Sequence, residues 1–486
     1  MSPERIEQMG NSHSAESLLQ DGFAALIDFG STFTKVALVD LEKAELVARH
    51  QSPTTVQEDI MLGLNTAIGM FSREEQKLLE GARKYACSSA AGGLRVVAIG
   101  LVPALTVEAA QRAALGAGAK IVASYGYELT DRDLEKITAE PCDLILLSGG
   151  IDGGNKDVIL HNAEILARID LDIPFIVAGN RVVSDRAAAA LRAGGHFAMV
   201  TENILPTLDE LNVEPARQLI RDVFMSRIVR AKGLDGAQDY VGGIIMPTPM
   251  ATLEAGKLLA NGSGEEAGQG ELLIVEVGGA TTNVHSLASG HPLQAGMTVK
   301  GLPEPFAKRT VEGDLGIRYN AHTILEKLGV AAVQRNISSP GVSLTTAEIR
   351  EKIARLAGNV GFTPENNADY GLDAALARCA VSVAMERHAG TVKEVPTLQG
   401  SAYLLYGKDL TQVPVVIGAG GVFAYGKYPR EILKASLFNQ ETPASLMPKN
   451  PAFYIDQHYI LYGVGLLSNH AGPKALKIAR KYLKAL

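Results

Sequence analysis

The sequence lacks several features that would assign it quickly to a class. It has no tryptophan, and its three cysteines, Cys87, Cys142 and Cys379, are far apart and form no CxxC pair. A disulfide scaffold or a cysteine-ligated zinc site is therefore not expected, and the predicted location is the reducing cytoplasm. No apolar run approaches the ~18–20 residues that a membrane-spanning helix needs, so no membrane association is expected.

An excess of positive charge is also missing. The chain has 46 Lys and Arg against 53 Asp and Glu, which gives a formal net charge of −7. This balance does not favour nucleic acid as a partner. The motif G-x-x-x-x-G-K-[ST] is absent, and no G-x-G-x-x-G follows an apolar strand, so neither a P-loop nor a dinucleotide fingerprint is present.

The most informative segment that is present runs from residue 26 to residue 40. It reads as an apolar strand, a short turn of glycine and hydroxyl residues, and a second apolar strand. Gly30 permits a close backbone approach to an anion, and successive amides in such a turn form an anion-binding concavity. Asp28 is placed to hold the water shell of Mg²⁺, and Lys35 either neutralises phosphate charge or faces solvent. The hydroxyl donors are Ser31, Thr32 and Thr34.

The same pattern recurs between Leu273 and Ser286. Taken alone, each segment fits an ordinary glycine-containing hairpin. Their recurrence predicts one nucleotide, with its phosphate chain, held between two similar halves. The residues of the second segment that match the first are Glu276, Gly278, Gly279, Thr281 and Thr282.

A third glycine-rich segment runs from Pro414 to Tyr425. A buried strand leads into Gly418, Gly420 and Gly421, and a helix is expected to follow. Glycines at a strand end allow the backbone to approach a flat ligand such as an adenine or a ribose. The order of two phosphate loops and then a glycine-rich strand end is more specific than any one of them.

The chain of 486 residues is long enough for two to four domains. Three strands and a helix after Phe23 are typical of the start of a ribonuclease-H-like half, and the second half is expected to repeat this order with its third strand at Leu293–Val299. Short apolar runs that alternate with helical stretches predict a doubly wound parallel sheet. The expected parts are a disordered extension (1–22), the first part of lobe I (23–94), an inserted doubly wound domain (95–230), a connector and return to lobe I (231–270), and lobe II (271–486).

These three segments resemble the phosphate-1, phosphate-2 and adenosine motifs of the superfamily of actin, sugar kinases and Hsp70-type ATPases. The chain more closely resembles the MutL family of glutamate mutase accessory proteins, also called GlmL. The segments that carry this closer resemblance are 26–39, 87–100, 144–155, 309–316 and 455–467. The resemblance implies an actin-like ATPase fold, ATP with Mg²⁺ as ligands, an adenosylcobalamin-dependent mutase as partner, and a role like that of reactivases that eject damaged cofactor.

Two residues depart from the superfamily pattern. Glu276 stands where Asp is usual, and Asn283 stands where an acidic residue is common. Slow hydrolysis, or binding with little turnover, is therefore the expectation. Two alternatives stay open, namely a small-molecule kinase of the same superfamily and an assembly protein that binds nucleotide without hydrolysing it.

Overall fold

The computed structural model describes residues 22–55, 58–89, 94–117, 119–208, 210–231, 240–242, 244–264, 266–292, 297–337, 342–397 and 400–486. These residues build an α/β protein with four sheets. Two of them combine parallel and antiparallel strands around the protein core and are called the mixed sheets below, one is fully parallel, and the fourth is a small three-stranded ribbon. The predicted α/β class is therefore confirmed. None of the described helices is both long and apolar enough to cross a membrane.

The first mixed sheet has the strand order β10-β4-β1-β2-β3. Its strands are β1 (Phe23–Phe29), β2 (Phe33–Asp40), β3 (Glu45–Pro53), β4 (Arg83–Ser88) and β10 (Ile244–Pro247). The first three strands are antiparallel, whereas β4 pairs parallel with both β1 and β10. Helices α1 (Ile60–Gly69) and α2 (Arg73–Gly81) begin at side-chain caps from Asp59 and Ser72.

The second mixed sheet follows the same plan, in the order β14-β12-β11-β17-β18-β19. Its strands are β11 (Leu272–Val277), β12 (Thr282–Leu287), β14 (Ala307–Glu312), β17 (Val415–Ala419), β18 (Ala452–Asp456) and β19 (Leu483–Ala485). Strands β11, β12 and β14 are antiparallel, and β17 and β18 continue the sheet in parallel pairings. Both sheets therefore place an antiparallel three-stranded unit beside parallel strands.

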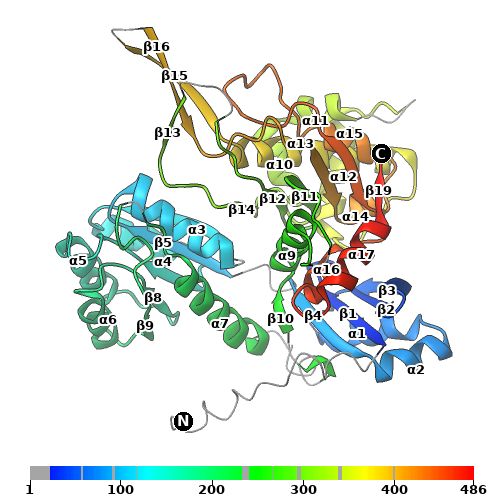
Figure 1. Ribbon diagram of the computed structural model, residues 1–486, viewed down its shortest axis with the longest axis horizontal. Helices are drawn as coiled ribbons and strands as arrows, with labels where there is room; N and C mark the ends of the chain where they lie inside the picture. The colour runs from blue at the N-terminus through cyan, green and yellow to red at the C-terminus, as the bar shows by residue number, and fades with distance from the viewer. Residues whose placement is uncertain are drawn as a thin grey trace.

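The third strand of this second unit is not where the sequence predicted it. Residues 293–296 of the expected strand lie outside the described residues, and β13 (Met297–Lys300) pairs with β16 (Gly400–Tyr406) instead. The position beside β12 is filled by β14, after the connection 288–306. The prediction was wrong because it assumed a short turn like residues 41–44, which join β2 to β3. Strand β13 is mostly exposed and has no apolar face for this core, and with β15 (Thr391–Thr397) and β16 it forms a ribbon that projects from the molecule (Figure 1).

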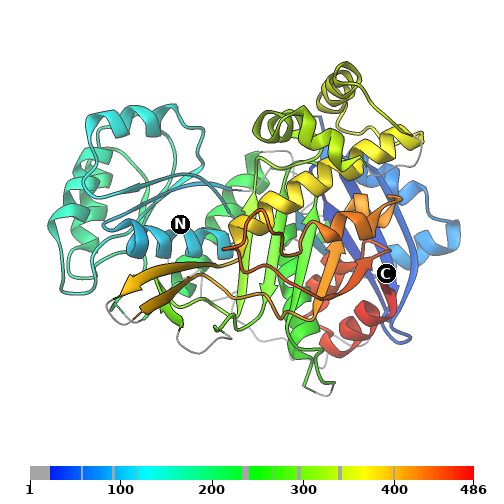
Figure 2. The same cartoon turned by 90° about the horizontal axis from the view of Figure 1, so that it is seen from above.

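A parallel sheet of order β6-β5-β7-β8-β9 forms a separate unit, seen on the left of Figure 2. All four pairings are parallel, as the apolar runs predicted. The strands are β5 (Arg95–Gly100), β6 (Lys120–Gly126), β7 (Leu144–Leu147), β8 (Phe175–Val177) and β9 (Ala198–Val200). The turn Pro103–Val107 follows β5, and the helices are α3 (Glu108–Ala117), α4 (Asp131–Ala139), α5 (Asp157–Leu166), α6 (Ser184–Ala193) and α7 (Glu214–Ala231). Separate apolar clusters cover its two faces.

Two helices lie between the mixed sheets. They are α9 (Thr248–Asn261) and α16 (Leu461–Leu467), and they share one core with the inner faces of both sheets (Figure 1). A Cβ at Gly465 would lie 1.7 Å from the carbonyl oxygen of Ala251, so only glycine allows the two helices to approach this closely. Helices α9 and α16 therefore form one layer that packs against both mixed sheets.

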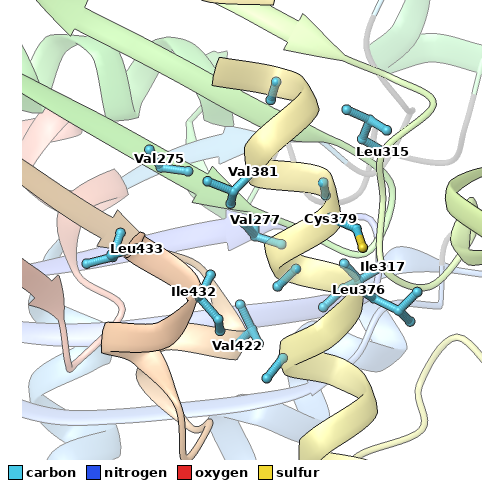
Figure 3. Packing of buried hydrophobic residues seen from close by; sticks show 14 of the residues in the cluster. Val275, Val277, Leu315, Ile317, Leu376, Cys379, Val381, Val422, Ile432 and Leu433 are labelled. Carbon is cyan, nitrogen blue, oxygen red and sulfur yellow. The ribbon is translucent and has the colours of Figure 1, made fainter. Parts of the chain in front are cut away.

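The outer face of the second sheet is covered by α13 (Asn367–His388). Figure 3 shows Leu376 and Val381 of this helix lying over Val275 and Val277 of β11, with Ile432 and Leu433 beside them. The remaining helices are α10 (Ala321–Leu328), α11 (Val330–Asn336), α12 (Thr346–Gly358), α14 (Gly421–Ala424), α15 (Pro429–Lys434) and α17 (Gly472–Tyr482).

Candidate functional site between the two mixed sheets

A cavity of about 390 Å³ lies where the two hairpin loops meet. Its walls include Thr32 and Lys35 from the first predicted segment, Gly278 and Gly279 from the second, and Gly421 from the third. The loops themselves are in contact, since a Cβ at Gly279 would lie 2.6 Å from the Thr32 Cγ2 atom. The tertiary structure therefore brings all three segments to one place.

The first loop is a tight hairpin closed by a hydrogen bond from the Gly30 amide to the Phe33 carbonyl (3.1 Å). No described residue accepts a hydrogen bond from the backbone amides of Ser31 and Thr32, which leaves both as donors for a ligand. A side chain at position 30 would collide with the Phe33 carbonyl oxygen at 2.5 Å and with Lys35 Nζ at 2.8 Å. Glycine is required here for space.

Asp28 is buried beneath this loop, and both of its oxygens have partners. Lys35 Nζ donates to Oδ2 at 2.6 Å, across the strand pair in which these two residues face each other. The Thr248 hydroxyl donates to Oδ1 at 2.6 Å, and Cys87 Sγ lies 3.6 Å from the same atom. Burial, together with the charge of Asp28, raises the pKa of the Cys87 thiol well above its usual range.

The second loop has the same backbone plan, with the Gly278 amide donating to the Thr281 carbonyl at 2.9 Å. The Gly279 carbonyl accepts from the Arg318 and Tyr319 amides, which anchors the loop to the segment after β14. The amides of Gly279 and Ala280 donate to none of the described residues. Together the two loops therefore offer four free backbone donors.

Glu276 occupies the position in β11 that Asp28 has in β1, but its partners differ. Asn283 Nδ2 donates to Oε2 at 3.0 Å, and the Thr252 hydroxyl donates to Oε1 at 3.3 Å. The ring of His285 lies 3.5 Å from Oε2. Burial alone raises the pKa of Glu276, but His285, Asn283 and Thr252 together outweigh burial and lower it. Burial lowers the pKa of His285, which favours the neutral ring.

One turn of α9 connects the two carboxylates. Thr248 and Thr252 stand four residues apart, so they lie on the same helix face. The first bonds to Asp28 of the first sheet and the second to Glu276 of the second. The shared helix therefore sets the relative position of both acidic groups.

Two of the predicted hydroxyl ligands are used inside the protein. Thr34 is buried and its hydroxyl lies 3.1 Å from that of Thr54. Thr282 is buried and donates to the Leu315 carbonyl at 2.8 Å. Neither residue lines the cavity, and neither do Ser31 and Thr281, which are half-buried. The loop amides are better placed to hold a phosphate than these hydroxyls.

Of the three predicted glycines Gly418, Gly420 and Gly421, the last lines the cavity and the first two do not. A Cβ at Gly418 would lie 2.6 Å from the ring of Phe423, so this residue provides space for packing. Gly420 has a φ of 108° and lies so close to β11 that a Cβ would be 2.2 Å from the Val277 carbonyl oxygen. The first two shape the strand end, and the third is open toward the cavity.

Several residues of the cavity were not found from the sequence. Arg318 and Asp373 form a buried pair with two parallel bonds, Nη1 to Oδ1 at 2.9 Å and Nη2 to Oδ2 at 2.6 Å. Burial raises the pKa of Asp373 even beside this guanidinium. Tyr459, which has a positive φ of 50°, places its ring 4.5 Å from Lys35 Nζ. No local pattern marks these residues, because their partners are far away in the chain.

Comparisons with known proteins place the chain in one family. A model of the family described as MutL protein matches residues 24–483. Protein MutL of Clostridium tetanomorphum is 46% identical over 459 residues, which cover 94% of this chain and 98% of that protein.

Solved structures are much less similar. Nucleotide-free acetone carboxylase aligns at 12% identity with a TM-score of 0.40, over 92% of this chain and 70% of that one. Xylulose kinase from Bifidobacterium adolescentis aligns at 13% identity with a TM-score of 0.30, over 93% of both chains. The activator of 2-hydroxyisocaproyl-CoA dehydratase from Clostridium difficile, with bound ADPNP, aligns at 10% identity with a TM-score of 0.28, over 96% and 99%. Scores this low support no conclusion about chemistry.

Proposed function

Because this chain belongs to the MutL family, we propose that it is a cytoplasmic accessory protein of an adenosylcobalamin-dependent mutase such as glutamate mutase. In this proposal it binds ATP with Mg²⁺, hydrolyses it slowly and uses the cycle to reactivate or remodel the mutase. One observation carries the nucleotide part. The cavity between the mixed sheets is lined by all three segments that resemble nucleotide-binding motifs.

The proposal treats the two mixed sheets as the ribonuclease-H-like lobes of an actin-like ATPase. Their common strand plan and the helical layer between them support this assignment. Lobe I then comprises 23–94 and 231–270, lobe II comprises 271–486, and the parallel-sheet unit (95–230) is inserted in lobe I. A nucleotide that touches both loops would couple its γ-phosphate to the closure of the lobes, which is a known form of switching.

The phosphate chain would be held mainly by backbone. Thr32 and Gly279, whose amides are free, line the cavity from its two sides, and the free amides of Ser31 and Ala280 are next to them in the chain. Successive free amides of this kind favour an anion-binding concavity. Lys35 adds a positive charge at the cavity wall. The adenosine would lie toward Gly421, where the cavity is also lined by Tyr425 and Tyr428.

Mg²⁺ would enter with the phosphates. It needs only one or two carboxylates because it keeps several waters. Asp28 and Glu276 would act on the ion only through water, since each carboxylate already accepts from protein donors and neither residue lines the cavity. Direct coordination by Asp28 would require Lys35 to leave its oxygen. When bound, the ion would supply charge stabilisation for phosphoryl transfer.

Substitution of Gly421 by valine tests the nucleotide site with little risk to the fold. A Cβ at Gly421 meets nothing within 4 Å, so the valine methyls would extend into the cavity. We expect ATP affinity, measured by calorimetry, to fall at least about tenfold, since a ligand pocket cannot absorb such a volume without lost contacts. The matched control is Gly69→Val, at an exposed position of α1 that is equally open. Equal losses in both variants, or none in Gly421→Val, would place the nucleotide elsewhere.

Phosphate release, with and without a mutase that carries inactivated cofactor, tests the reaction itself. The variant Glu276→Gln keeps an oxygen acceptor and the side-chain length but removes the charge. We expect it to bind ATP as the wild type does and to release phosphate more slowly, because positioning and charge at the reacting groups supply most of the catalysis in phosphoryl transfer. Unchanged release by Glu276→Gln would remove this residue from the reaction.

A nucleotide-binding assembly protein without turnover is the second candidate. The observation that favours it is that both oxygens of Asp28 and of Glu276 already accept from protein groups and that neither residue lines the cavity. Saturable binding of labelled ATP with no phosphate release, alone or with the mutase, would select this candidate over the first.

A further inference from the structure

A second cavity, of about 550 Å³, lies where the parallel-sheet unit meets the second mixed sheet. Its walls come from α3, α7, α9 and β14, and it shares no lining residue with the first cavity. Figure 1 shows α3 and α7 lying on the side of the parallel-sheet unit that faces α9 and β14. This place is therefore separate from the proposed nucleotide site.

Arg309 of β14 is the exceptional residue in this cavity. It is only 4% exposed, and its Nη2 atom donates to the Leu115 carbonyl. Its Nε and Nη1 atoms have no hydrogen-bond partner among the described residues. Burial lowers the pKa of this guanidinium to about 9. A buried cation without a counter-charge is costly, and proteins normally pair it.

No carboxylate among the described residues forms an ion pair with Arg309. Glu276 is the acidic group whose field reaches it, but its oxygens are bonded to Asn283 and Thr252, and no ion pair joins it to Arg309 in the described part of the chain. Arg309 thus lines the cavity while two of its donor atoms are buried and find no acceptor among the described residues. Guanidinium groups recognise planar carboxylates and phosphates through paired hydrogen bonds.

The other charges around the cavity are also unbalanced toward positive. Arg217 and Arg221 of α7 share one carboxylate, that of Glu214, which is largely exposed. The Nε atoms of both arginines find no partner among the described residues. The remaining cations of the lining are Arg112, Lys257 and Lys308, and the remaining acids are Asp222, Glu254 and Glu304. The cavity is therefore lined by three guanidinium groups that each have at least one donor atom unused by the described residues.

One wall of the cavity is apolar. Met250 and Leu253 of α9 face it, together with Leu115 and Ala307. A cavity with an apolar wall and a few convergent polar groups is the usual form of a small-molecule site. The apolar wall would contact the organic part of a ligand while the arginines hold its charge.

We propose that this cavity binds a small organic anion, anchored by a phosphate or carboxylate group on Arg309 and supported by Arg217 and Arg221. Such a ligand would connect α7 of the parallel-sheet unit to β14 of the second mixed sheet. It would supply the counter-charge that Arg309 lacks, and its apolar part would lie on Met250 and Leu253. The site does not depend on the proposed nucleotide function.

Calorimetric titration with three probes tests the site. The probes are inorganic phosphate, phenyl phosphate and succinate, at constant ionic strength, on the whole chain. We expect the wild type to bind at least one probe, and phenyl phosphate to bind more tightly than inorganic phosphate because its ring contacts the apolar wall. Comparison of phenyl phosphate with succinate distinguishes a phosphate ligand from a carboxylate ligand.

Three variants assign any binding to this cavity. Arg309→Met keeps the length of the side chain but removes its charge, and we expect the affinity to fall at least about tenfold, as loss of a buried charge-assisted pair usually costs that or more. Arg217→Met, at a less buried position, should also weaken binding and serves if Arg309→Met does not fold. Arg186→Met, at an exposed position of α6, is the matched control and should bind as the wild type does. Wild-type affinity in both Arg309→Met and Arg217→Met, or no binding of any probe to the wild type, would overturn the proposal.

Discussion

The two mixed sheets bury an acidic residue at equivalent positions and stabilise it in different ways. In the first sheet Asp28 faces Lys35 across the strand pair, and the two residues form an ion pair. In the second sheet Glu276 faces Asn283 in the same register, and the partners are amide, hydroxyl and imidazole groups. The difference shows that one strand plan accepts an ion pair or a neutral hydrogen-bond network, provided that each oxygen of the buried carboxylate has a donor.

The consequence for function follows from the charge balance. The Asp28 half carries no net charge at this pair, whereas the Glu276 half keeps one negative charge among neutral donors. If Mg²⁺ enters as proposed, the Glu276 side attracts it more strongly. Asn283, one of the two residues that depart from the superfamily pattern, is thus the neutral partner that leaves this carboxylate without a cross-strand ion pair.

The largest expected effect comes from removing the cation of the first pair. Lys35→Met leaves Asp28 buried without its counter-charge, and we expect the free energy of unfolding to fall by about 3–5 kcal/mol. The equivalent change in the second half, Asn283→Leu, leaves one acceptor unsatisfied and should cost about 1–3 kcal/mol. Urea denaturation of both variants measures the difference.

The double variant Asp28→Asn with Lys35→Met provides the control. It removes both charges and should regain most of the lost stability. Equal losses in Lys35→Met and Asn283→Leu would show that the ion pair and the neutral network are equivalent, and the comparison would fail.

A second buried lysine, Lys408, differs from Lys35 in that its hydrogen-bond partners among the described residues are neutral groups. Lys408 is fully buried, and its ammonium donates to the carbonyls of Ala288 and Phe306, both at 2.7 Å, and to the Ser286 hydroxyl. Burial lowers its pKa from 10.5 to about 7. Above pH 7 the folded state therefore binds fewer protons than the unfolded state, so stability rises as the pH increases from about 7 toward 10.

The expected slope is at most about 1.4 kcal/mol per pH unit, which over two units approaches 3 kcal/mol. Denaturation at pH 6, 7, 8 and 9 measures it. In Lys408→Met this part of the slope should disappear. A slope that is the same in the variant and the wild type would mean that Lys408 keeps an ordinary pKa.

We expect the smallest change in the free energy of unfolding from substitutions of the two threonines of α9. Thr248 donates to Asp28 at 2.6 Å, and Thr252 donates to Glu276 at 3.3 Å. Valine has nearly the same shape without the hydroxyl. We expect Thr248→Val to lower the unfolding free energy by about 2 kcal/mol and Thr252→Val by about 1 kcal/mol, since hydrogen bonds to charged groups are the stronger ones and weaken with length. Thermal denaturation checks the order, and a reversed order would contradict the geometry.

Much of the fold could be predicted from patterns within short segments. The hairpins at Gly30 and Gly278, the parallel strands after Arg95 and the strand before Gly418 all appear where their apolar runs predicted them. The third strand of the second sheet could not, because β14 follows a connection of unusual length and β13 pairs elsewhere. Strand pairing over such a distance is decided by the available sheet edge and not by local sequence.

For the candidate site, the sequence indicated which loops would meet but not how their side chains would be used. Thr34 and Thr282 were predicted as phosphate ligands, and their hydroxyls are bonded inside the protein. Arg318, Asp373 and Tyr459 were not predicted, and they line the cavity. A hydroxyl or charged side chain in a loop can face either a ligand or the protein. The alternation of side chains along a strand does not extend into the turn, so it does not predict which direction such a side chain takes.

The sequence by itself determined the local elements, because glycine, hydroxyl and apolar residues at fixed spacing allow few backbone conformations. It also determined the family, through similarity along nearly the whole chain. Only the tertiary structure decided which buried charges are paired. Asp28 and Thr248 are 220 residues apart, and Arg309 reaches Leu115 across 194 residues. Burial makes each unpaired charge costly, so these distant contacts decide which groups are satisfied and which remain available to a ligand.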